Sequence, residues 1–466
     1  MTMANNKSTD DRRADSNRRQ MMLEMPLNKL IPLMALPTVV SMLVTALYSA
    51  TDVLFVSSLG TEATAAVGVG AALESVVLMA GSFLAVGAAS FISRLLGAGD
   101  NTKAAHTLAA SFYSALALGG VMTGLGFLFL EPMLILFGAT EAVLPLGKDY
   151  AHYVLIAAPF MAANFVLNHT LRSEGSVGYA MAGLVIGAVI GAGLDALFIF
   201  GFGWGVRGAS AATAISKLIS FVVLLWPYLR KKSVLSLHPR NIRVTGEIAS
   251  EVFKMGCPAL LRLAATTASA VVTNRIAGGF SDAALAAVTV AGRIVGILQS
   301  AMLGFGQGFQ PVAGFAWGAR QYDRIRAGFK FTSIAAVAAM LILGGVMYVY
   351  SPWLVALFNW EGGDEVARIG TLALRLQLIA MPVVGWVIVV NMLFAGIGKA
   401  FGAIVLSMAR QGYLLIPLLY ALSAVWGVDG LAAAQAAADA LSLFIALPLA
   451  VHALRRLRPD DTSRPA

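Results

Sequence analysis

Three carboxylates, Asp52, Glu74 and Asp195, interrupt long apolar stretches in the first half of this sequence. A charged side chain in hydrocarbon is costly unless water or a partner compensates it, so such residues usually mark an ion or substrate pathway. Two carboxylates at one depth repel each other, and binding one small cation relieves that repulsion. These residue types therefore indicate a site for a proton or another small cation.

Counting residues from the predicted turns places Asp52, Asp195 and Thr213 at similar depth. Asp52 lies about five residues before the turn at 57–60, near the end of its apolar stretch. Asp195 lies about nine residues before the turn near residue 204, and Thr213 about nine residues after it. A helix rises ~1.5 Å per residue, so the three side chains share one layer if their helices are neighbours. We expect them to form the cation site.

Further polar side chains lie close to this layer in the sequence. Tyr48 is one helical turn before Asp52 on the same face. Asn164 and Asn168 are also one turn apart, so a single helix face carries two amides. That face either lines a cavity, which we favour, or joins helices by hydrogen bonds. We assign these residues and Glu74 to a substrate cavity.

Pro37 stands fifteen residues before Asp52 in the same apolar stretch. A proline inside a helix removes a backbone hydrogen bond and bends the helix. Proline kinks are common in membrane helices. The sequence therefore allows two readings of Pro37, an ordinary kink or a hinge beneath Asp52, and we take the hinge as our hypothesis.

The elements that must position these residues are membrane helices. Hydrophobic residues make up 58% of the 466 positions and charged residues only 12%, about half the charge of a soluble protein. Mean hydropathy is +0.79. Apolar runs of about 20 residues span a hydrocarbon core, and a barrel would show short alternating strands instead. Twelve runs are present, at about 29–56, 62–87, 104–130, 145–171, 178–202, 206–229, 246–276, 282–309, 326–350, 370–396, 399–423 and 429–453.

The second half of the chain repeats the first at a shift of roughly 221 residues. Pro37 aligns with Pro258, and Gly97 aligns with Gly318. Each half then holds six helices, an even number, so both halves enter the membrane in the same orientation. We therefore predict an all-α membrane protein of two six-helix bundles, related by a pseudo-twofold axis along the membrane normal.

The net charge of +9 reports topology rather than a nucleic-acid partner. If the first helix runs outward, both termini and the even-numbered loops are cytoplasmic. Of the 33 Lys and Arg residues, 24 then lie on the cytoplasmic side and five lie within apolar runs. Only four lie in outer loops, namely Lys148, Arg207, Arg275 and Arg368. This positive-inside asymmetry predicts a multi-pass membrane protein with both termini in the cytoplasm.

Composition also suggests where the chain divides. The polar N-terminus has no apolar core before a small-residue cleavage site, so it does not read as a signal peptide. A basic loop separates the two halves of the repeat. We expect a disordered cytoplasmic tail at 1–24, a first bundle at 25–229, a linker loop at 230–244, a second bundle at 245–455 and a cytoplasmic tail at 456–466.

The second half lacks acids at the repeat positions of Asp52 and Asp195, where Thr273 and Pro417 stand. Cation handling is therefore predicted in the first bundle alone. The second bundle instead carries intramembrane arginines, which either pair internally, with Asp439 as one candidate partner, or reach toward water. They are Arg262, Arg293, Arg375 and Arg410.

Four stretches resemble signatures of the MATE (multidrug and toxic compound extrusion) transporters, and the likeness covers about residues 25–455. They are ISRLLGAGDNTKA (92–104), NHTLRSEGS (168–176), LDALFIFGFGWGVRGASAATAIS (194–216) and GFGQGFQPVAGFAWGARQYDRIRAG (304–328). The prokaryotic branch with aspartates in the N-terminal lobe is the most similar. The resemblance implies an inner-membrane antiporter that exports amphipathic, often cationic compounds against entry of H⁺ or Na⁺.

In that branch the positions matching Asp52, Asp195 and Thr213 form the cation site, and the proline matching Pro37 bends in one proposed mechanism. The positions matching Tyr48, Tyr150, Asn164 and Asn168 line the same lobe. The resemblance implies no cofactor beyond the coupling ion, and small-molecule substrates and lipid as partners. We expect a monomer, no nucleic-acid partner and no enzymatic activity, because no paired-histidine or serine-elbow motif is present.

One position departs from the family pattern. The family's asparagine one turn before the second aspartate is Gly191 here. Losing that amide oxygen weakens a shell for Na⁺, which needs several oxygens, but leaves a proton on Asp52 and Asp195 undisturbed. We therefore favour H⁺ over Na⁺. The alternative function is a lipid-linked precursor flippase of the same superfamily, for which Arg262, Arg293 and Arg375 could help to bind pyrophosphate.

Overall fold

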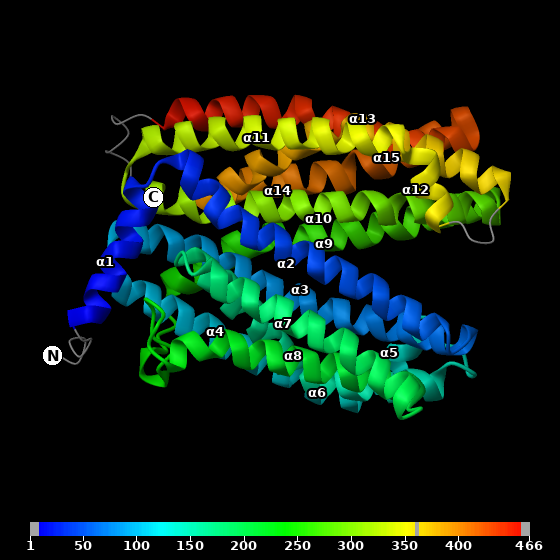
Figure 1. The fold of residues 1–466 in the computed structure, drawn as a ribbon, viewed down its shortest axis with the longest axis horizontal. Coiled ribbons are helices and arrows are strands. Elements are labelled where there is room, and N and C mark those ends of the chain that lie inside the picture. The colour runs from blue at the N-terminus through cyan, green and yellow to red at the C-terminus, as the bar shows by residue number, and fades with distance from the viewer. Residues whose placement is uncertain (1–8, 359–362, 458–466) are drawn as a thin grey trace. The chain divides into compact units, whose positions relative to one another are not determined.

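The computed structural model describes residues 9–358 and 363–457, with side chains from residue 17 onward (Figure 1). The first half comprises α1 (Thr9–Glu24), α2 (Leu27–Ser57), α3 (Thr61–Ala98), α4 (Asn101–Leu128), α5 (Leu130–Leu136), α6 (Leu144–Ser173), α7 (Val177–Ala196), a π-helical turn η1 (Leu197–Gly201) and α8 (Gly205–Leu229). The second half comprises η2 (Pro239–Asn241), α9 (Gly246–Phe280), α10 (Asp282–Gly318), α11 (Tyr322–Val349), α12 (Ser351–Phe358), α13 (Asp364–Ile397), α14 (Ala400–Met408), a π-helical turn η3 (Ala409–Tyr413) and α15 (Leu415–Arg456).

Eleven helical spans of the described residues are long and apolar enough to cross a membrane. The last of them, 400–456, contains two of the twelve predicted segments. Gly427 interrupts it with a φ of 58° and a ψ of −133°, a conformation that glycine adopts without strain. Arg410 and Asp439 are nevertheless ion-paired across this interruption, although a straight helix would separate them by ~40 Å. The chain therefore folds back at Gly427, and the predicted all-helical fold is confirmed.

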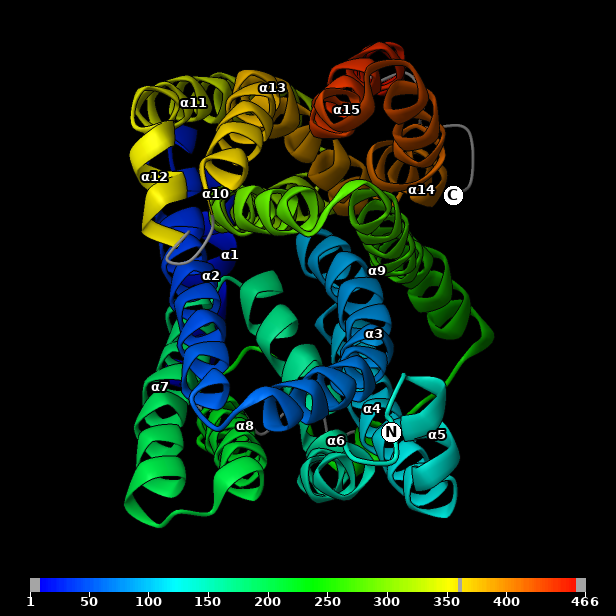
Figure 2. The ribbon, with the colours of Figure 1, turned by 90° about the vertical axis from the view of Figure 1, so that its right-hand side faces the viewer.

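The chain forms two compact units, and each repeats the same packing plan. Unit 1 contains residues 1–25 and 40–256, and unit 2 contains 26–39 and 257–466. In unit 1, α6 packs against α3, α4 and α8, and in unit 2, α13 packs against α10, α11 and α15 (Figure 2). These two helices are the most buried of the membrane-length helices. They occupy equivalent repeat positions, and a glycine with positive φ, Gly175 or Gly398, follows each.

Each unit also takes in the beginning of a helix whose remainder belongs to the other. The first residues of α9 pack on α3 in unit 1, where a Cβ at Gly87 would lie only 2.2 Å from the Val252 carbonyl oxygen. The first residues of α2 pack on α10 in unit 2, where a Cβ at Gly308 would lie 2.4 Å from the Cα of Ala35. Gly87 and Gly308 are 221 residues apart, so the sequence repeat is also a repeat of close backbone contacts, typical of small-residue packing in membranes.

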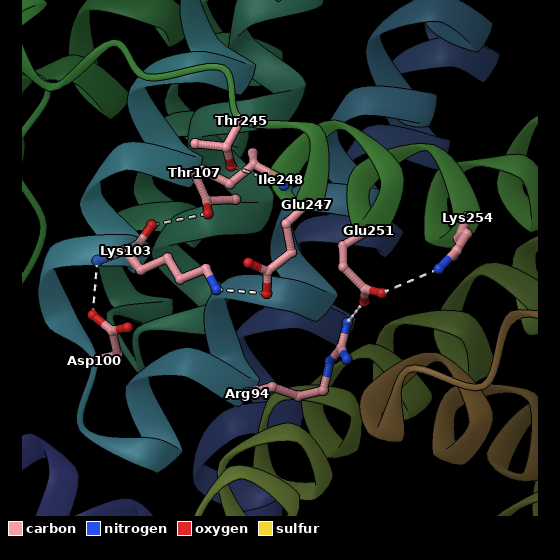
Figure 3. Close-up of polar contacts among 9 residues, drawn as sticks. All are labelled: Arg94, Asp100, Lys103, Thr107, Thr245, Glu247, Ile248, Glu251 and Lys254. Atoms are coloured by element: carbon pink, nitrogen blue, oxygen red, sulfur yellow. Dashed lines mark hydrogen bonds and ion pairs between the residues drawn. The ribbon is translucent and has the colours of Figure 1, made fainter. Parts of the chain in front are cut away.

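The start of α9 is held in unit 1 by ion pairs as well as by this contact (Figure 3). Arg94 of α3 pairs with Glu251 at 2.7 Å, and Lys103 of α4 pairs with Glu247 at 2.5 Å. The Asp100 side chain accepts a hydrogen bond from the backbone N–H of Lys103 and so caps α4. These charges lie at the end of unit 1 that carries the linker loop, which keeps them out of the apolar layer.

The N-terminal tail differs from the prediction of disorder, because residues 9–24 form α1. Arg18 donates a hydrogen bond to the carbonyl of Lys232 at 2.8 Å, and Arg19 donates to the carbonyl of Gly97 at 3.0 Å. Met22 is fully buried. The segment has no apolar core of its own. It is ordered by hydrogen bonds that its arginines donate to backbone carbonyls of unit 1. The predicted division at 229 and 245 stays a prediction, and the C-terminal tail beyond Leu457 lies outside the described residues.

Candidate functional site

The centre of the site is a contact between α2 and α8 within unit 1. The hydroxyls of Tyr48 and Thr213 lie 3.4 Å apart, within hydrogen-bonding distance. Tyr48 also interacts electrostatically with Asp195, Asp52 and Glu74. The structure thus brings the predicted cation-site residues together around one tyrosine ring, as expected from helix depth.

Asp195 lies near the end of α7, directly before the π-helical turn η1. Such turns widen the helix by one residue and are frequent at functional sites. Its side chain is fully buried, and neither carboxylate oxygen has a hydrogen-bond partner of normal geometry among the described residues. A buried carboxylate without a partner is unstable as an anion, so this position favours binding of a cation.

Asp52 lies on α2 and is half-buried. It interacts electrostatically with Asp195, with Glu74 and with Lys217. The cation of Lys217 lies 3.7 Å from the carboxylate of Glu74 and forms an ion pair with it. Lys217 therefore pairs with the third acid, Glu74, and also attracts Asp52. Among the described residues, neither aspartate forms an ion pair of its own.

Gly191 explains how the tyrosine fits beside Asp195. A Cβ at position 191 would lie 2.9 Å from Cε2 and 3.0 Å from Cζ of Tyr48. The ring of Tyr48 therefore occupies the space into which a side chain from Gly191 would extend. The departure from the family's asparagine is thus matched by an aromatic side chain on the neighbouring helix.

Tyr150 on α6 is packed against a glycine in a similar way. It is buried, and a Cβ at Gly70 of α3 would overlap its ring, at 2.0 Å from Cδ1. It interacts electrostatically with Glu74 and Asp52. Neither Tyr150 nor Glu74, which we assigned to the substrate cavity, is among the residues that line the cavity described next.

A cavity of about 260 Å³ lies within unit 1 beside the acids. Tyr48, Asn164 and Asn168 line it as predicted, together with Lys217 and apolar residues that include Met42, Leu78, Met161 and Phe165. Polarizable methionine and aromatic walls adapt to ligands of different shape. Tyr48 both lines this cavity and contacts Thr213, so it connects the cavity to the aspartates.

The two asparagines also join helices, the alternative left open by the sequence. The Asn168 amide donates to the carbonyl of Ala180 at 2.9 Å, and the Asn164 amide lies 3.5 Å from the carbonyl of Lys217. The hydroxyl of Ser220 donates to the Asn164 oxygen at 3.4 Å. Asn164 and Asn168 therefore hold α7 and α8 against α6 and also line the cavity.

Sequence reasoning missed the partner of Lys217 and the role of Gly191. The ion pair of Lys217 with Glu74 depends on which faces of α3 and α8 meet, and no local pattern reports that. A signal for Gly191 did exist, because a glycine one turn before an intramembrane acid leaves room for a large neighbour. Pro37 lies in α2, two residues before the chain passes from unit 2 to unit 1.

At the repeat positions of Asp52 and Asp195 the second unit carries Thr273 and Pro417, and its charged groups are arranged differently. Asp439 is fully buried and accepts a 2.5 Å hydrogen bond from Nε of Arg410, which confirms that candidate pairing. Arg375 donates to the hydroxyl of Ser351 and lies over the ring of Tyr348. The intramembrane arginines are thus spread over several helices.

Comparison with known proteins identifies the architecture. The model of the MatE family matches residues 37–197 and 258–421, one match in each half of the repeat. The chain belongs to the MatE family. Its relatives are transporters. The first matched region contains Asp52 and Asp195, and the second contains the four intramembrane arginines of unit 2.

Curated relatives extend this likeness over nearly the whole chain. The multidrug export protein MepA of Staphylococcus saprophyticus is 25% identical over 432 residues, which is 91% of this chain and 94% of the relative. MepA of Staphylococcus aureus strain MSSA476 is 25% identical over 446 residues, 94% of this chain and 96% of the relative. Both relatives are bacterial, as the predicted prokaryotic branch requires.

Solved structures show the same fold. A crystal structure of a MATE in complex with MaL6 has a TM-score of 0.90 and 23% identity, with 94% of this chain and 98% of the other covered. An outward-facing multidrug resistance MATE family transporter of the MOP superfamily has the same scores and coverage. These likenesses establish the predicted two-bundle MATE fold for this multi-pass membrane protein.

Proposed function

We propose that this protein exports amphipathic, often cationic compounds in exchange for H⁺ bound at Asp52 and Asp195. The observation that carries the proposal is the fully buried Asp195, whose carboxylate faces the Tyr48 hydroxyl and the carboxylate of Asp52 and forms no ion pair among the described residues. Two such acids share a proton more readily than they share two negative charges. The naming of the relatives as multidrug export proteins supports the substrate class.

Coupling requires that ion and substrate sites respond to each other. Tyr48 lines the cavity and contacts Thr213 at the ion site. A proton bound at Asp195 removes a negative charge that faces Tyr48. The electrostatic attraction between a cationic substrate and the Tyr48 side of the cavity therefore changes. One charge moving through 100 mV supplies about 2.3 kcal/mol, which supports a concentration ratio of nearly fiftyfold.

H⁺ is favoured over Na⁺ by the composition of the site. A hard cation such as Na⁺ is bound by several oxygens. Position 191 offers no side-chain oxygen, and the ring carbons of Tyr48 occupy its space. A proton needs only one carboxylate. We therefore propose that the proton binds to the Asp52 and Asp195 pair. From the positive-inside asymmetry we also propose that both termini lie on the cytoplasmic side of the inner membrane.

The test is transport in proteoliposomes in which the pH gradient and the Na⁺ gradient are varied independently. We expect a pH gradient alone to drive export of a cationic dye, and Asp52→Asn to abolish exchange because a neutral amide cannot carry the proton. Glu131→Gln is the matched control, because Glu131 is an exposed acid paired with Lys148 and should exchange normally. Full exchange by Asp52→Asn refutes the assignment of Asp52 to the ion site. Exchange driven by a Na⁺ gradient without a pH gradient would identify Na⁺, and not H⁺, as the coupling ion.

A lipid-linked precursor flippase is the second candidate, and the geometry supports it less. A pyrophosphate needs several cations in one place. Arg293 is exposed on α10, and Arg375 is engaged by Ser351 and Tyr348. Neither of these two arginines lines the cavity that contains Arg262, so the three arginines named for this function do not converge. Increased resistance of expressing cells to cationic dyes favours export, and accumulation of lipid-linked precursors in a deletion strain favours the flippase.

A further inference from the structure

Unit 2 contains a second cavity, of about 230 Å³, which has no part in the proposed exchange of H⁺. Two guanidinium groups, of Arg262 on α9 and Arg410 in η3, line it. We propose that this cavity binds the singly charged anionic group of an amphipathic molecule. The proposal does not depend on how unit 1 handles cations.

The first argument is the charge balance inside the cavity. Arg262 and Arg410 are close enough to repel each other electrostatically. Asp439 compensates Arg410, to which it is bonded at 2.5 Å. Among the described residues no carboxylate forms an ion pair with Arg262, and none lines the cavity. One positive charge is therefore uncompensated at the depth of membrane-spanning helices, where it is costly.

The second argument is the supply of hydrogen-bond donors. Nη2 of Arg410 is buried and has no hydrogen-bond partner in the described part of the chain. The guanidinium of Arg262 and the carboxamides of Gln299 and Gln411 add further donors to the cavity wall. Guanidinium groups bind carboxylate and phosphate oxygens in charge-assisted pairs, which are stronger than neutral hydrogen bonds. An anion would satisfy both arginines at once.

The third argument concerns what else the cavity surrounds. Leu303, Val387, Ile388, Met392 and Leu406 form the rest of the wall. An anion attached to an apolar body fits such a wall better than a free hydrated ion, because its body gains contact with these side chains. The net charge of +1 from two arginines and one aspartate matches one negative charge and does not match a pyrophosphate.

An amphipathic carboxylate and the phosphate of an anionic phospholipid share this chemistry. The probe is a fluorescent fatty acid carrying a dansyl group, and its alcohol analogue is the uncharged control. Binding is measured by fluorescence to the purified full chain in a neutral detergent. Phosphatidylglycerol and phosphatidylcholine are then added separately as competitors.

The decisive variant is Arg262→Gln, which removes the uncompensated charge without touching the Arg410–Asp439 pair. We expect its affinity for the carboxylate probe to fall about tenfold or more, with little change for the alcohol. Arg293→Gln is the matched control, because Arg293 is an exposed intramembrane arginine outside the cavity lining. Arg262→Lys keeps the charge and should retain part of the affinity. Thermal unfolding of each variant shows whether a loss of binding is a loss of folding.

Each outcome decides the proposal. Displacement by phosphatidylglycerol but not by phosphatidylcholine assigns the cavity to a lipid phosphate. Displacement by other amphipathic carboxylates but not by either lipid assigns it to a transported or regulatory solute. Equal affinity of folded Arg262→Gln and the original chain for the carboxylate, or equal affinity of the carboxylate and the alcohol for the original chain, overturns it.

Discussion

At the scale of single residues, Gly191 sets which group stands beside Asp195. Its missing side chain admits the ring of Tyr48, whose hydroxyl then reaches Thr213. The same position with an asparagine would offer an amide oxygen and would displace the ring. The glycine at position 191 therefore determines that an aromatic ring, and not a side-chain oxygen, lies beside Asp195.

We predict that Gly191→Ala destabilises the protein. The new Cβ would lie 2.9 Å from the Tyr48 ring, and overpacking of this kind costs about 1–3 kcal/mol. That loss exceeds the gain of about 0.5–1 kcal/mol from replacing glycine in a helix. Thermal unfolding in detergent should show a lower midpoint. Gly193→Ala on the same helix, where nothing lies within 4 Å of the new Cβ, should match or exceed the original midpoint, and equal shifts for the two variants would contradict the packing argument.

Glu174, just beyond α6 and outside the membrane span, carries a prediction about pH. It is fully buried and accepts a 2.6 Å hydrogen bond from Ser233 of the linker. Burial raises the pKa of Glu174, although Ser233 and Arg18 act in the opposite direction. Because the folded pKa lies above the unfolded one, the folded state holds the proton more tightly. Its contribution to stability is complete below the ordinary pKa of about 4.3 and is lost as pH rises through the raised value.

The expected result is that the linker, residues 230–244, opens more easily as pH rises. Hydrogen exchange of its amides, corrected for the intrinsic rate at each pH, should show falling protection in the original chain. Glu174→Gln keeps the hydrogen-bond acceptor for Ser233 and removes the titration, so its protection should not depend on pH in this range. A similar pH dependence in both proteins would show that another group is responsible.

At the scale of elements, α2 and α9 are the helices that pass from one unit to the other. Pro37 lies two residues before this passage in α2, and Pro258 lies one residue after it in α9. Each proline removes a backbone hydrogen bond of its helix near the point where the chain passes from one unit to the other. Pro258 is the repeat equivalent of Pro37, so the hinge hypothesis for Pro37 extends to Pro258.

We predict that Pro37→Ala and Pro258→Ala each slow exchange in proteoliposomes by about an order of magnitude, because a continuous helix resists bending. Substrate binding to the detergent-solubilised protein should change little, since neither proline lines the cavity of unit 1. Pro32→Ala, in the same helix but exposed and inside the segment of unit 2, is the control. Normal turnover of both hinge variants would leave the prolines as ordinary kinks.

At the scale of the whole molecule, the distribution of basic residues defines an orientation in the membrane. The linker, the α3–α4 turn and α1 gather at one end of unit 1 through contacts such as Arg19 with Gly97 and His106 with Asn241. This end carries most of the basic residues of unit 1. The positive-inside rule therefore predicts that this end faces the cytoplasm.

Cysteine labelling tests that orientation. The single native cysteine, Cys257, is first replaced by alanine. Ser236→Cys in the linker should then react with a membrane-impermeant maleimide only in inside-out vesicles. Ser58→Cys, in the turn before α3, should react only in intact cells or right-side-out vesicles. Labelling of both positions from the same side would contradict the assigned topology.

The positions of the helices, the internal repeat and the depth of the acids along their helices could be predicted from the sequence alone. Each of these follows from local periodicity and from the hydrocarbon thickness that an apolar run must cross, as the agreement at Asp195 and Thr213 shows. Tertiary structure alone decided that Lys217 compensates Glu74, that Tyr48 fills the space at Gly191, and that α1 is ordered. Those outcomes depend on which helix faces meet, and contacts between residues far apart in the chain leave no periodic trace in either partner.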